Sequence, residues 1–250
     1  MNFGYLAELA SGATTLQRVT SGDTDAFIGR VPDELMSFWH QNGLLFFPAS
    51  ALTLCLPDLY DPHLEHLMSV VPDLHAGDFA AVAYDCFGTT YLWQKTGHLW
   101  IYDLQTGLLD NQTARRQLDA VPDDLAQLYA DAGVEMPLQG AEEPLLALAN
   151  APEDLGNTLA NAVVESVING HLDADGVPLF PQLVERFGPV QEGQVFALIH
   201  PDNRHDINSY EKTTISDALT RWPFQLMVSI QRAGGNLPEV ETRIYDIPEG

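Results

Sequence analysis

The spacing of apolar residues predicts two amphipathic helices in the first third of the chain. Within Pro32–Gln41, Leu35, Phe38 and Trp39 recur at helical spacing, so one face of this segment is apolar. The proline and the two acids that follow it suit the first turn of a helix, and Gly43 marks the end of that helix. The same reasoning predicts a helix from Asp61 to about Val70.

A strand-like period replaces the helical one between and after these helices. Apolar and aromatic runs are separated by glycine-containing turns such as Phe87-Gly88 and Thr96-Gly97, which is typical of an antiparallel meander. Residues 5–9, at the start of the chain, fit either a short helix or a loose arm. The expected strands are Leu44–Phe47, Leu52–Leu56, Phe79–Tyr84, Thr90–Trp93, Leu99–Tyr102 and Leu108-Leu109.

The rest of the chain has two further patterns. Residues 113–177 have apolar residues at helical spacing, interrupted by prolines, and are expected to be helical. A second group of helices and strands then follows, in which Pro223 should break or kink the last helix. The elements expected there are helix Leu179–Phe187, strand Gln194–Ile199, a helix within Ile215–Ala233 and strand Val240–Tyr245.

Together these patterns predict an α+β fold in three parts. Residues 1–112 should form an antiparallel meander with packed helices, residues 113–177 an acidic helical connecting segment, and residues 178–250 a smaller C-terminal α+β unit. No long flexible linker separates the parts, so we expect the two α+β units to pack together.

The charge of the chain limits its partners. The chain has 35 acidic and 11 basic residues, a formal net charge of −24. Such a protein repels nucleic acid and anionic lipid surfaces and attracts cationic partners. The sequence has no cationic leader segment and no run of about 18 apolar residues. We therefore expect a cytoplasmic protein that binds neither nucleic acid nor membrane.

Catalytic and metal-binding motifs are not evident in the sequence. The two cysteines, Cys55 and Cys86, lie in apolar contexts typical of reduced, packed thiols. His63 and His66 are one helical turn apart but do not form a zinc-protease motif, and DADG at Asp173–Gly176 lacks the later acids of a calcium loop. The prediction is a protein with no catalytic residues, metal or cofactor.

Two parts of the chain resemble known modules. VPDELMSFWHQNG, LPDLYDPHLEHL and AYDCFGTTYLWQKTG resemble the GAD-like domain, over about residues 20–110. LFPQLVERFGPVQEGQVFALIHP, residues 179–201, resembles the start of the C-terminal domain of Tdi-type immunity proteins. These modules occur in this order in antidotes to type VI secretion effectors. The resemblance implies a cytosolic bacterial protein that binds and neutralises a toxin, often a nuclease, and it does not imply catalysis.

The charge and the resemblance agree on how such a protein would act. A nuclease presents lysine and arginine to phosphate, so an acidic partner is attracted to the same surface and can occlude it stoichiometrically. The acids expected to contact the toxin are Asp123, Asp124, Glu142 and Glu143, followed by Asp173, Asp175, Asp202 and Asp206.

Two other classes of function remain open from the sequence. One is a small cytosolic hydrolase or metalloenzyme, which would use His63 and His66, or His200 and His205 with nearby aspartates. The other is a SUKH-like interaction module without a toxin partner, because a helix of the WHQNG type followed by a meander is also similar to that superfamily. Stoichiometric bound metal would favour the first, and a neighbouring toxin gene would argue against the second.

Overall fold

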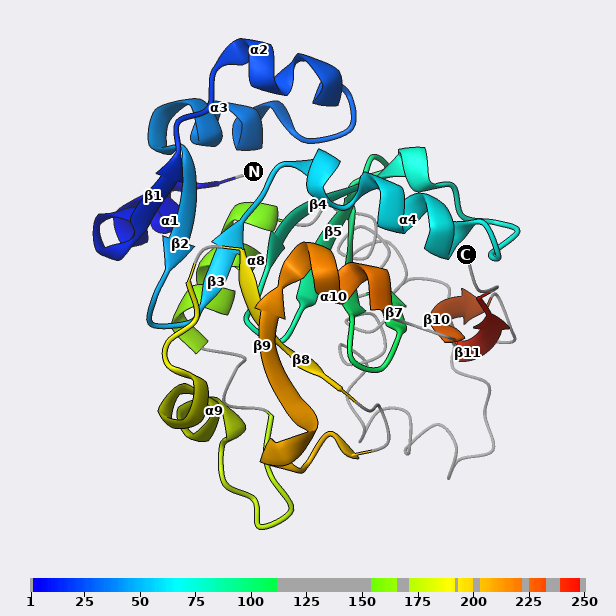
Figure 1. Cartoon of the computed structure of the whole chain (residues 1–250). Coiled ribbons are helices and arrows are strands. Elements are labelled where there is room, and N and C mark those ends of the chain that lie inside the picture. Colours follow the sequence, from blue (N-terminus) through cyan, green and yellow to red (C-terminus); the bar gives the residue numbers. More distant parts are fainter. Residues whose placement is uncertain are drawn as a thin grey trace, which may run out of the picture.

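The computed structural model describes residues 2–111, 154–165, 171–191, 193–199, 203–221, 225–232 and 239–247 (Figure 1). A twisted nine-stranded sheet and a two-stranded sheet form its frame. In spatial order the larger sheet contains β1 (Thr14–Gln17), β2 (Leu44–Phe47), β3 (Leu52–Leu54), β4 (Phe79–Tyr84), β5 (Thr89–Gln94), β6 (His98–Asp103), β7 (Leu108–Asn111), β10 (Gln225–Arg232) and β11 (Glu239–Asp246). The smaller sheet pairs β8 (Gln194–Leu198) with β9 (Tyr210–Thr214).

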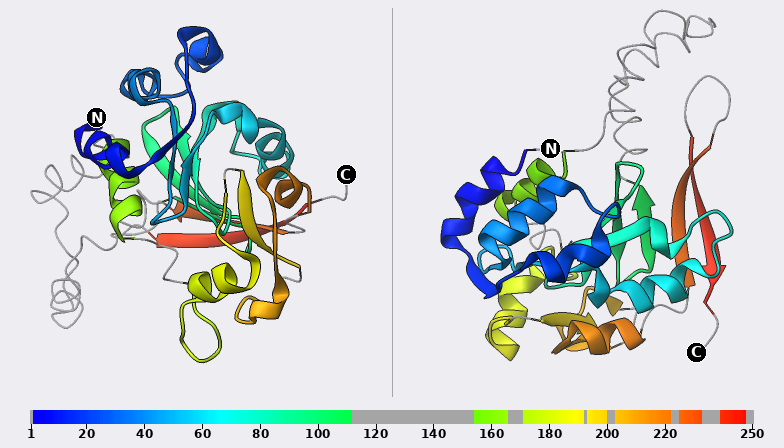
Figure 2. Two further views of the ribbon diagram at one scale, coloured as in Figure 1. Left: turned by 60° about the vertical axis from the view of Figure 1, so that its left-hand side comes forward. Right: turned by 90° about the horizontal axis from the view of Figure 1, so that it is seen from above.

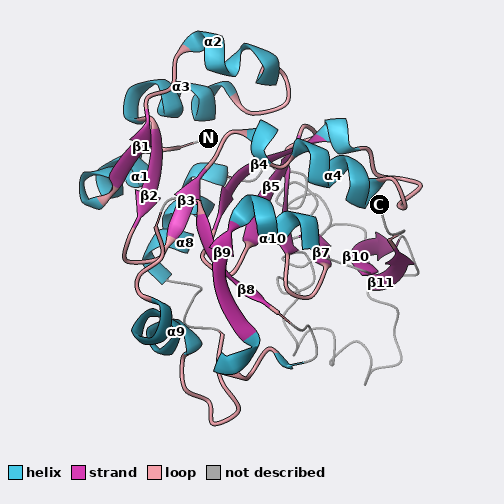
Figure 3. Ribbon diagram, viewed as in Figure 1, coloured by secondary structure: helices cyan, strands magenta, loops and turns pink. Residues whose placement is uncertain are grey.

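Helices surround these sheets, as the secondary-structure view shows (Figure 3). The α-helices are α1 (Gly4–Leu9), α2 (Ser21–Thr24), α3 (Asp33–Asn42), α4 (Asp61–Met68), α8 (Leu155–Glu165), α9 (Leu179–Phe187) and α10 (Ile215–Arg221). Short 3-10 turns are η1 (Ala10–Gly12), η2 (Asp25–Phe27), η3 (Pro57–Leu59), η4 (Ala76–Asp78) and η7 (Ile207–Ser209). No helix in the described ranges is long and apolar enough to cross a bilayer.

The two predicted amphipathic helices are confirmed. In α3 the residues Leu35, Phe38 and Trp39 are buried, with Pro32 as the residue before the first turn. The helix ends at Gly43, whose φ of 77° is accessible to glycine at little cost and whose N–H donates to the carbonyl of Trp39. Helix α4 likewise buries its predicted face. Residues 4–9 form α1, so the helical alternative for the N-terminus is the correct one.

The meander is also confirmed, and its two faces form separate cores. Along β6, Leu99 belongs to one apolar cluster, whereas Trp100 and Tyr102 belong to another. Helices α1, α3 and α8 cover the first face, and α4 and α10 cover the second (Figure 2). Because both faces of the central strands are covered, every residue of β4 is buried.

One irregularity in β4 changes this alternation. Ala81 pairs with Leu92 and Ala83 pairs with Tyr91, so Val82 is an extra residue in the strand. As a consequence Val82 and Ala83 both contribute to the same apolar cluster. The bulge adds twist at the centre of the sheet.

The last helix is shorter than expected. A helix within Ile215–Ala233 is found only as α10, and Gln225–Arg232 is β10. The alternation explains the difference, because Leu226 and Val228 are buried two residues apart, as the face of a strand requires. Strand β10 pairs in parallel with β7, and β11 pairs antiparallel with β10, so the C-terminal hairpin extends the N-terminal sheet.

The smaller sheet lies between two apolar clusters. Val195 and Ala197 of β8 face the cluster beneath α4 and α10, whereas Phe196 and Leu198 face α9. The backbone N–H of Phe196 also donates to the carbonyl of Cys86 at 2.7 Å, which links β8 to the β4–β5 turn. The C-terminal unit is therefore packed against the N-terminal sheet.

The architecture confirms the predicted α+β class, with a large N-terminal sheet, its helices and a small C-terminal α+β unit. Within the predicted helical segment 113–177, residues 155–165 are helical as α8, whereas residues 171–177 form a turn. Most of that segment lies outside the described residues. The predicted division at residues 112 and 177 stays a prediction.

Candidate functional site

The acids predicted to contact a partner fall into two groups. Three of them lie in two loops of the C-terminal unit that the structure describes: Asp173, Asp175 and Asp206. The other five lie outside the described residues: Asp123, Asp124, Glu142, Glu143 and Asp202. Their contact role stays a prediction.

Asp173 organises the loop that precedes α9. Its Oδ1 accepts hydrogen bonds from the backbone N–H groups of Asp175 and Val177 at 3.0 and 2.8 Å. Its Oδ2 accepts from Nε2 of Gln182 on α9 at 2.7 Å. The hydrogen bond from Gln182 lowers the pKa of the Asp173 carboxyl the most, and the backbone hydrogen bonds lower it further. The carboxyl is therefore ionised at neutral pH. The side chain shapes the loop as well as giving it charge.

Asp206 does the same for the loop before η7. Its carboxylate accepts from the backbone N–H and the side-chain amide of Asn208, both at 2.9 Å. The neighbouring His205 donates from Nδ1 to the carbonyl of Leu172 at 2.8 Å. This bond ties the loop of Asp206 to the loop of Asp173, and the two loops lie together at one end of the molecule (Figure 1).

Exposed apolar side chains accompany these acids. Leu172 and Val177 are 38% and 49% exposed in the same loop as Asp173 and Asp175. Ile199, which follows β8, is 44% exposed and donates its backbone N–H to the carbonyl of Ser209, beside the second loop. An interface needs such apolar contacts at its centre, with charges at its rim. The two loops thus carry the chemical classes that a protein contact uses.

The histidine pairs considered for catalysis are placed differently. His63 is buried, and its Nε2 lies 3.2 Å from the hydroxyl of Tyr102, whereas His66 is exposed. Burial lowers the pKa of His63 to about 4, so it is neutral at physiological pH. His205 holds the Leu172 loop, and His200 lies outside the described residues. Within the described ranges, no group of three or more His, Cys, Asp or Glu side chains is placed to hold a metal ion.

Both cysteines are buried free thiols. Burial raises the pKa of Cys55 and of Cys86 above the ordinary value of 9.0. A thiol with a raised pKa carries little thiolate at neutral pH, and thiolate is the nucleophilic form. Their chemistry is that of packed core residues.

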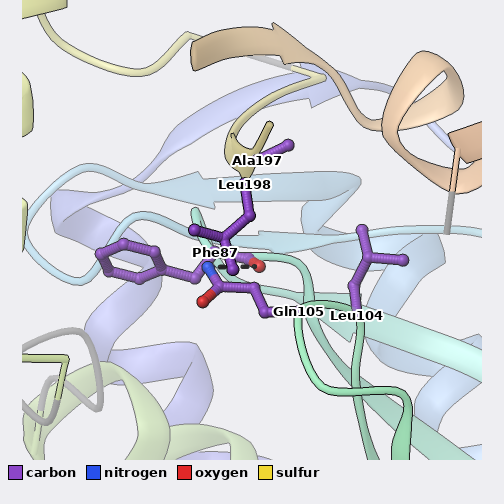
Figure 4. Close-up of a pocket in the computed structure, with 5 residues that line it drawn as sticks. All are labelled: Phe87, Leu104, Gln105, Ala197 and Leu198. Carbon is purple, nitrogen blue, oxygen red and sulfur yellow. Dashed lines mark hydrogen bonds between the residues drawn. The ribbon is translucent and has the colours of Figure 1, made fainter. Parts of the chain in front are cut away.

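A small cavity marks the seam between the N-terminal sheet and β8 (Figure 4). Its volume is about 10 Å³, which is the space of a single water molecule. In the close-up, the side-chain amide of Gln105 lies below Leu198 and is hydrogen-bonded at 3.4 Å to the carbonyl of Phe87. The remaining lining residues are Leu104 and Ala197. This cavity is too small for a substrate.

A larger depression lies between α1 and α3, which we call the α1–α3 groove. Its volume is about 360 Å³, and it is more open than enclosed. The lining residues are Phe3, Gly4 and Ala7 from the first segment and Asp33, Glu34, Ser37, Phe38, Gln41 and Asn42 from α3. From the sequence, Asp33 and Glu34 are expected only to stabilise the N-terminus of this helix. The groove depends on the packing of Phe3, just before α1, against Phe38 of α3, and no local pattern indicates that contact.

Comparison with known proteins identifies the module that contains this groove. The sequence profile of the GAD-like domain matches residues 3–102. Residues 3–102 form a GAD-like domain. No curated protein sequence matches the chain. The fold of the whole chain resembles the crystal structure of Atu4351 from Agrobacterium tumefaciens, with a TM-score of 0.67 and 15% identity over 96% of this chain and 97% of that one.

The surface of the GAD-like domain is dominated by acids. Its Arg30 is ion-paired with Asp61, and Lys95 with Asp78, so two of its basic side chains are neutralised within the domain. Its remaining basic residue is Arg18, which is exposed. The exposed acids of the domain are Glu8, Asp23, Asp25, Asp33, Glu34, Asp58, Glu65 and Asp73.

Proposed function

We propose that this protein is an immunity protein that binds and neutralises a cognate type VI secretion toxin. The toxin in this proposal is a basic nuclease domain, and inhibition is stoichiometric occlusion in the cytoplasm. The GAD-like domain at residues 3–102 supports the proposal. So does the resemblance of residues 179–201 to the C-terminal domain of Tdi-type immunity proteins.

The observation that carries the proposal is the distribution of charge over the GAD-like domain. Its exposed acids far outnumber its exposed basic residues, and Arg30 and Lys95 are both held in ion pairs with its own aspartates. A surface of this kind attracts a cationic protein at long range and raises its association rate. It also repels nucleic acid, so the domain competes with a nucleic-acid substrate for the partner and does not bind that substrate.

The C-terminal loops supply a second contact in this proposal. Asp173, Asp175 and Asp206 lie in two loops that His205 ties together, beside the exposed side chains of Leu172 and Val177. The apolar side chains would be desolvated on binding, and the acids would set the register around them. We propose the same charged role for Asp123, Asp124, Glu142, Glu143 and Asp202.

The test is purification of the tagged full-length protein from the bacterium that encodes it. Proteins that copurify are identified by mass spectrometry, and the complex is washed across a series of salt concentrations. We expect one basic partner in a one-to-one complex, and its association rate, measured afterwards with the purified proteins, should fall as salt rises. The isolated partner should cleave nucleic acid, and one equivalent of this protein should abolish the cleavage.

Other outcomes would contradict the proposal. A partner that keeps full activity in the complex would remove the inhibitory role and leave an interaction module. The lack of any toxin-like partner, together with stoichiometric metal or turnover by this protein alone, would overturn the proposal and favour an enzyme instead. A test variant is Asp175→Asn, which should weaken binding without unfolding the chain, because the hydrogen bonds that shape the loop are accepted by Asp173.

A further inference from the structure

The α1–α3 groove has a fixed apolar base. The rings of Phe3 and Phe38 pack with centroids 5.5 Å apart, and both side chains are more than nine-tenths buried. Phe38 belongs to the apolar face of α3, so the base of the groove is part of the protein core. A base of this kind changes little on binding, which lowers the entropy that a ligand loses when it is held there.

The walls of the groove are low on both sides. Gly4 and Ala7 project little from α1, and Ser37 is the exposed residue facing outward at the middle of α3. Small side chains let another backbone approach a helix closely. The open, shallow shape of the groove suits an extended or helical segment of a protein better than an enclosed small molecule.

The charge of the groove selects its occupant. Asp33 and Glu34 lie at one end of it, and none of its lining residues is basic. At the other end, Gln41 and Asn42 present side-chain amides that can accept or donate hydrogen bonds. An apolar base between an acidic end and an amide end is complementary to an apolar side chain flanked by lysine or arginine. Anionic ligands, nucleic acid among them, are disfavoured by the same charges.

We propose that the α1–α3 groove is a docking site for a lysine- or arginine-bearing segment of a partner protein. An apolar side chain of that segment lies over the Phe3–Phe38 pair, and its flanking cation lies beside Asp33 and Glu34. The class of partner rests on the proposed function, since a basic toxin would present such a segment. The groove is distinct from the C-terminal loops of Asp173 and Asp206, so two separate surfaces would hold the partner.

A peptide titration tests the groove without the natural partner. The probe is a short synthetic peptide with a central leucine flanked by lysines, added to the full-length protein labelled with nitrogen-15. We expect amide resonances of residues 3–9 and 33–43 to shift, and the Ser37→Trp variant to lose these shifts because the indole fills the groove. Ser216→Trp, on the exposed face of α10, is the matched control and should keep them. The same peptide with glutamates in place of lysines should not bind.

The partner itself provides the second test. With the toxin recovered in the purification experiment, Asp33→Asn and Ser37→Trp should each raise the dissociation constant about tenfold, whereas Asp73→Asn should not change it. Asp73 is another exposed acid, and it lies away from the groove, so it controls for the loss of one charge.

The outcomes separate the two proposals. Unchanged toxin binding by both groove variants would overturn the docking site and leave the proposed function intact. If no toxin is recovered, the peptide titration still decides the groove. Shifts that occur outside α1 and α3, or that the glutamate peptide produces equally, would overturn it.

Discussion

The imidazole of His171 is stacked on the ring of Phe87, with centroids 4.0 Å apart and planes inclined by 21°. Phe87 lies in the β4–β5 turn of the GAD-like domain, and His171 begins the loop that leads into α9. The same phenyl ring also contacts Tyr210 and Phe196 of the smaller sheet. Phe87 is therefore the residue around which the two parts of the molecule meet.

Replacing His171 by Ala should loosen this junction. The stacked pair contributes about 1 kcal/mol beyond its buried area, so the free energy of unfolding should fall by about 1–2 kcal/mol. Burial lowers the pKa of His171 below its ordinary 6.5, so protonation favours the unfolded chain. The stabilisation that the neutral His171 side chain gives to the folded state is fully present above about pH 6.5 and is lost as the pH falls below that value. Urea denaturation at several pH values measures this loss, and His75→Ala, at an exposed site, is the control.

A buried carboxyl lies two residues before Phe87. Oδ1 of Asp85 accepts from the backbone N–H groups of Phe87 and Thr89 at 2.8 and 2.9 Å, and these bonds close the β4–β5 turn. Oδ2 is buried and has no hydrogen-bond partner among the residues described. Burial outweighs the two bonds and raises the pKa of Asp85 from 3.8 to about 6. At neutral pH the turn therefore contains a buried negative charge.

Replacing Asp85 by Asn should stabilise the protein at pH 7. The amide keeps an acceptor for the turn and removes the charge, and the raised pKa corresponds to a cost of roughly 3 kcal/mol for the ionised form. In the wild type this cost grows as the pH rises from 3.8 to about 6, because the folded state holds the proton more tightly. We expect a gain of about 1–3 kcal/mol at pH 7 and a flatter pH profile. Thermal unfolding from pH 4 to 7 measures both, and an Asn variant less stable at pH 7 would contradict the argument.

Local patterns predicted the elements that bury one clear face. In helices α3 and α4, the apolar period and the residues that start or end the helix lie close together in the sequence. In the meander of β4–β7, the apolar runs and the glycine turns between them are equally local. The strand β10 was missed because a continuous apolar run after a helix does not distinguish a strand from further helix. Its parallel pairing with β7 joins residues more than a hundred positions apart, and no local rule specifies that partner.

The candidate sites show the same limit. The acids Asp173 and Asp206 could be named from composition, but their roles in shaping two joined loops depend on His205 and Gln182. The α1–α3 groove exists only because Phe3, just before α1, packs against Phe38 of α3. The sequence indicates which residues can bind a cationic partner, and packing decides which of them share a surface.

Replacing Arg30 should destabilise the junction of α3, α4 and β4. Its guanidinium donates to both carboxylate oxygens of Asp61 at 2.9 and 2.7 Å and to the carbonyl of Phe79 at 2.7 Å. Arg30→Lys keeps the charge but loses the two-pronged geometry, so it should still cost about 1 kcal/mol, and Arg30→Ala about 2 kcal/mol. Chemical denaturation measures both values. Lys95→Ala breaks a more exposed pair with Asp78, and a loss as large as that of Arg30→Ala would contradict this ranking.

Gly156 permits the close approach of α8 to the N-terminal segment. A Cβ atom at this position would lie 2.3 Å from the carbonyl oxygen of Asn2 and 3.0 Å from Cα of Phe3, and backbone atoms cannot move aside as a flexible side chain can. The backbone N–H of Asn2 also donates to Asp154 at 3.0 Å, which fixes the start of α8 beside it.

Gly156→Ala should therefore lower the free energy of unfolding by about 1–3 kcal/mol, although alanine favours helices. The matched control is Gly77→Ala, where an added Cβ would meet nothing within 4 Å. Because α1 forms one wall of the α1–α3 groove, the Gly156 variant should also weaken binding of the lysine peptide, whereas the Gly77 variant should not. Equal stability of the two variants would show that α8 and the N-terminal segment can separate at little cost.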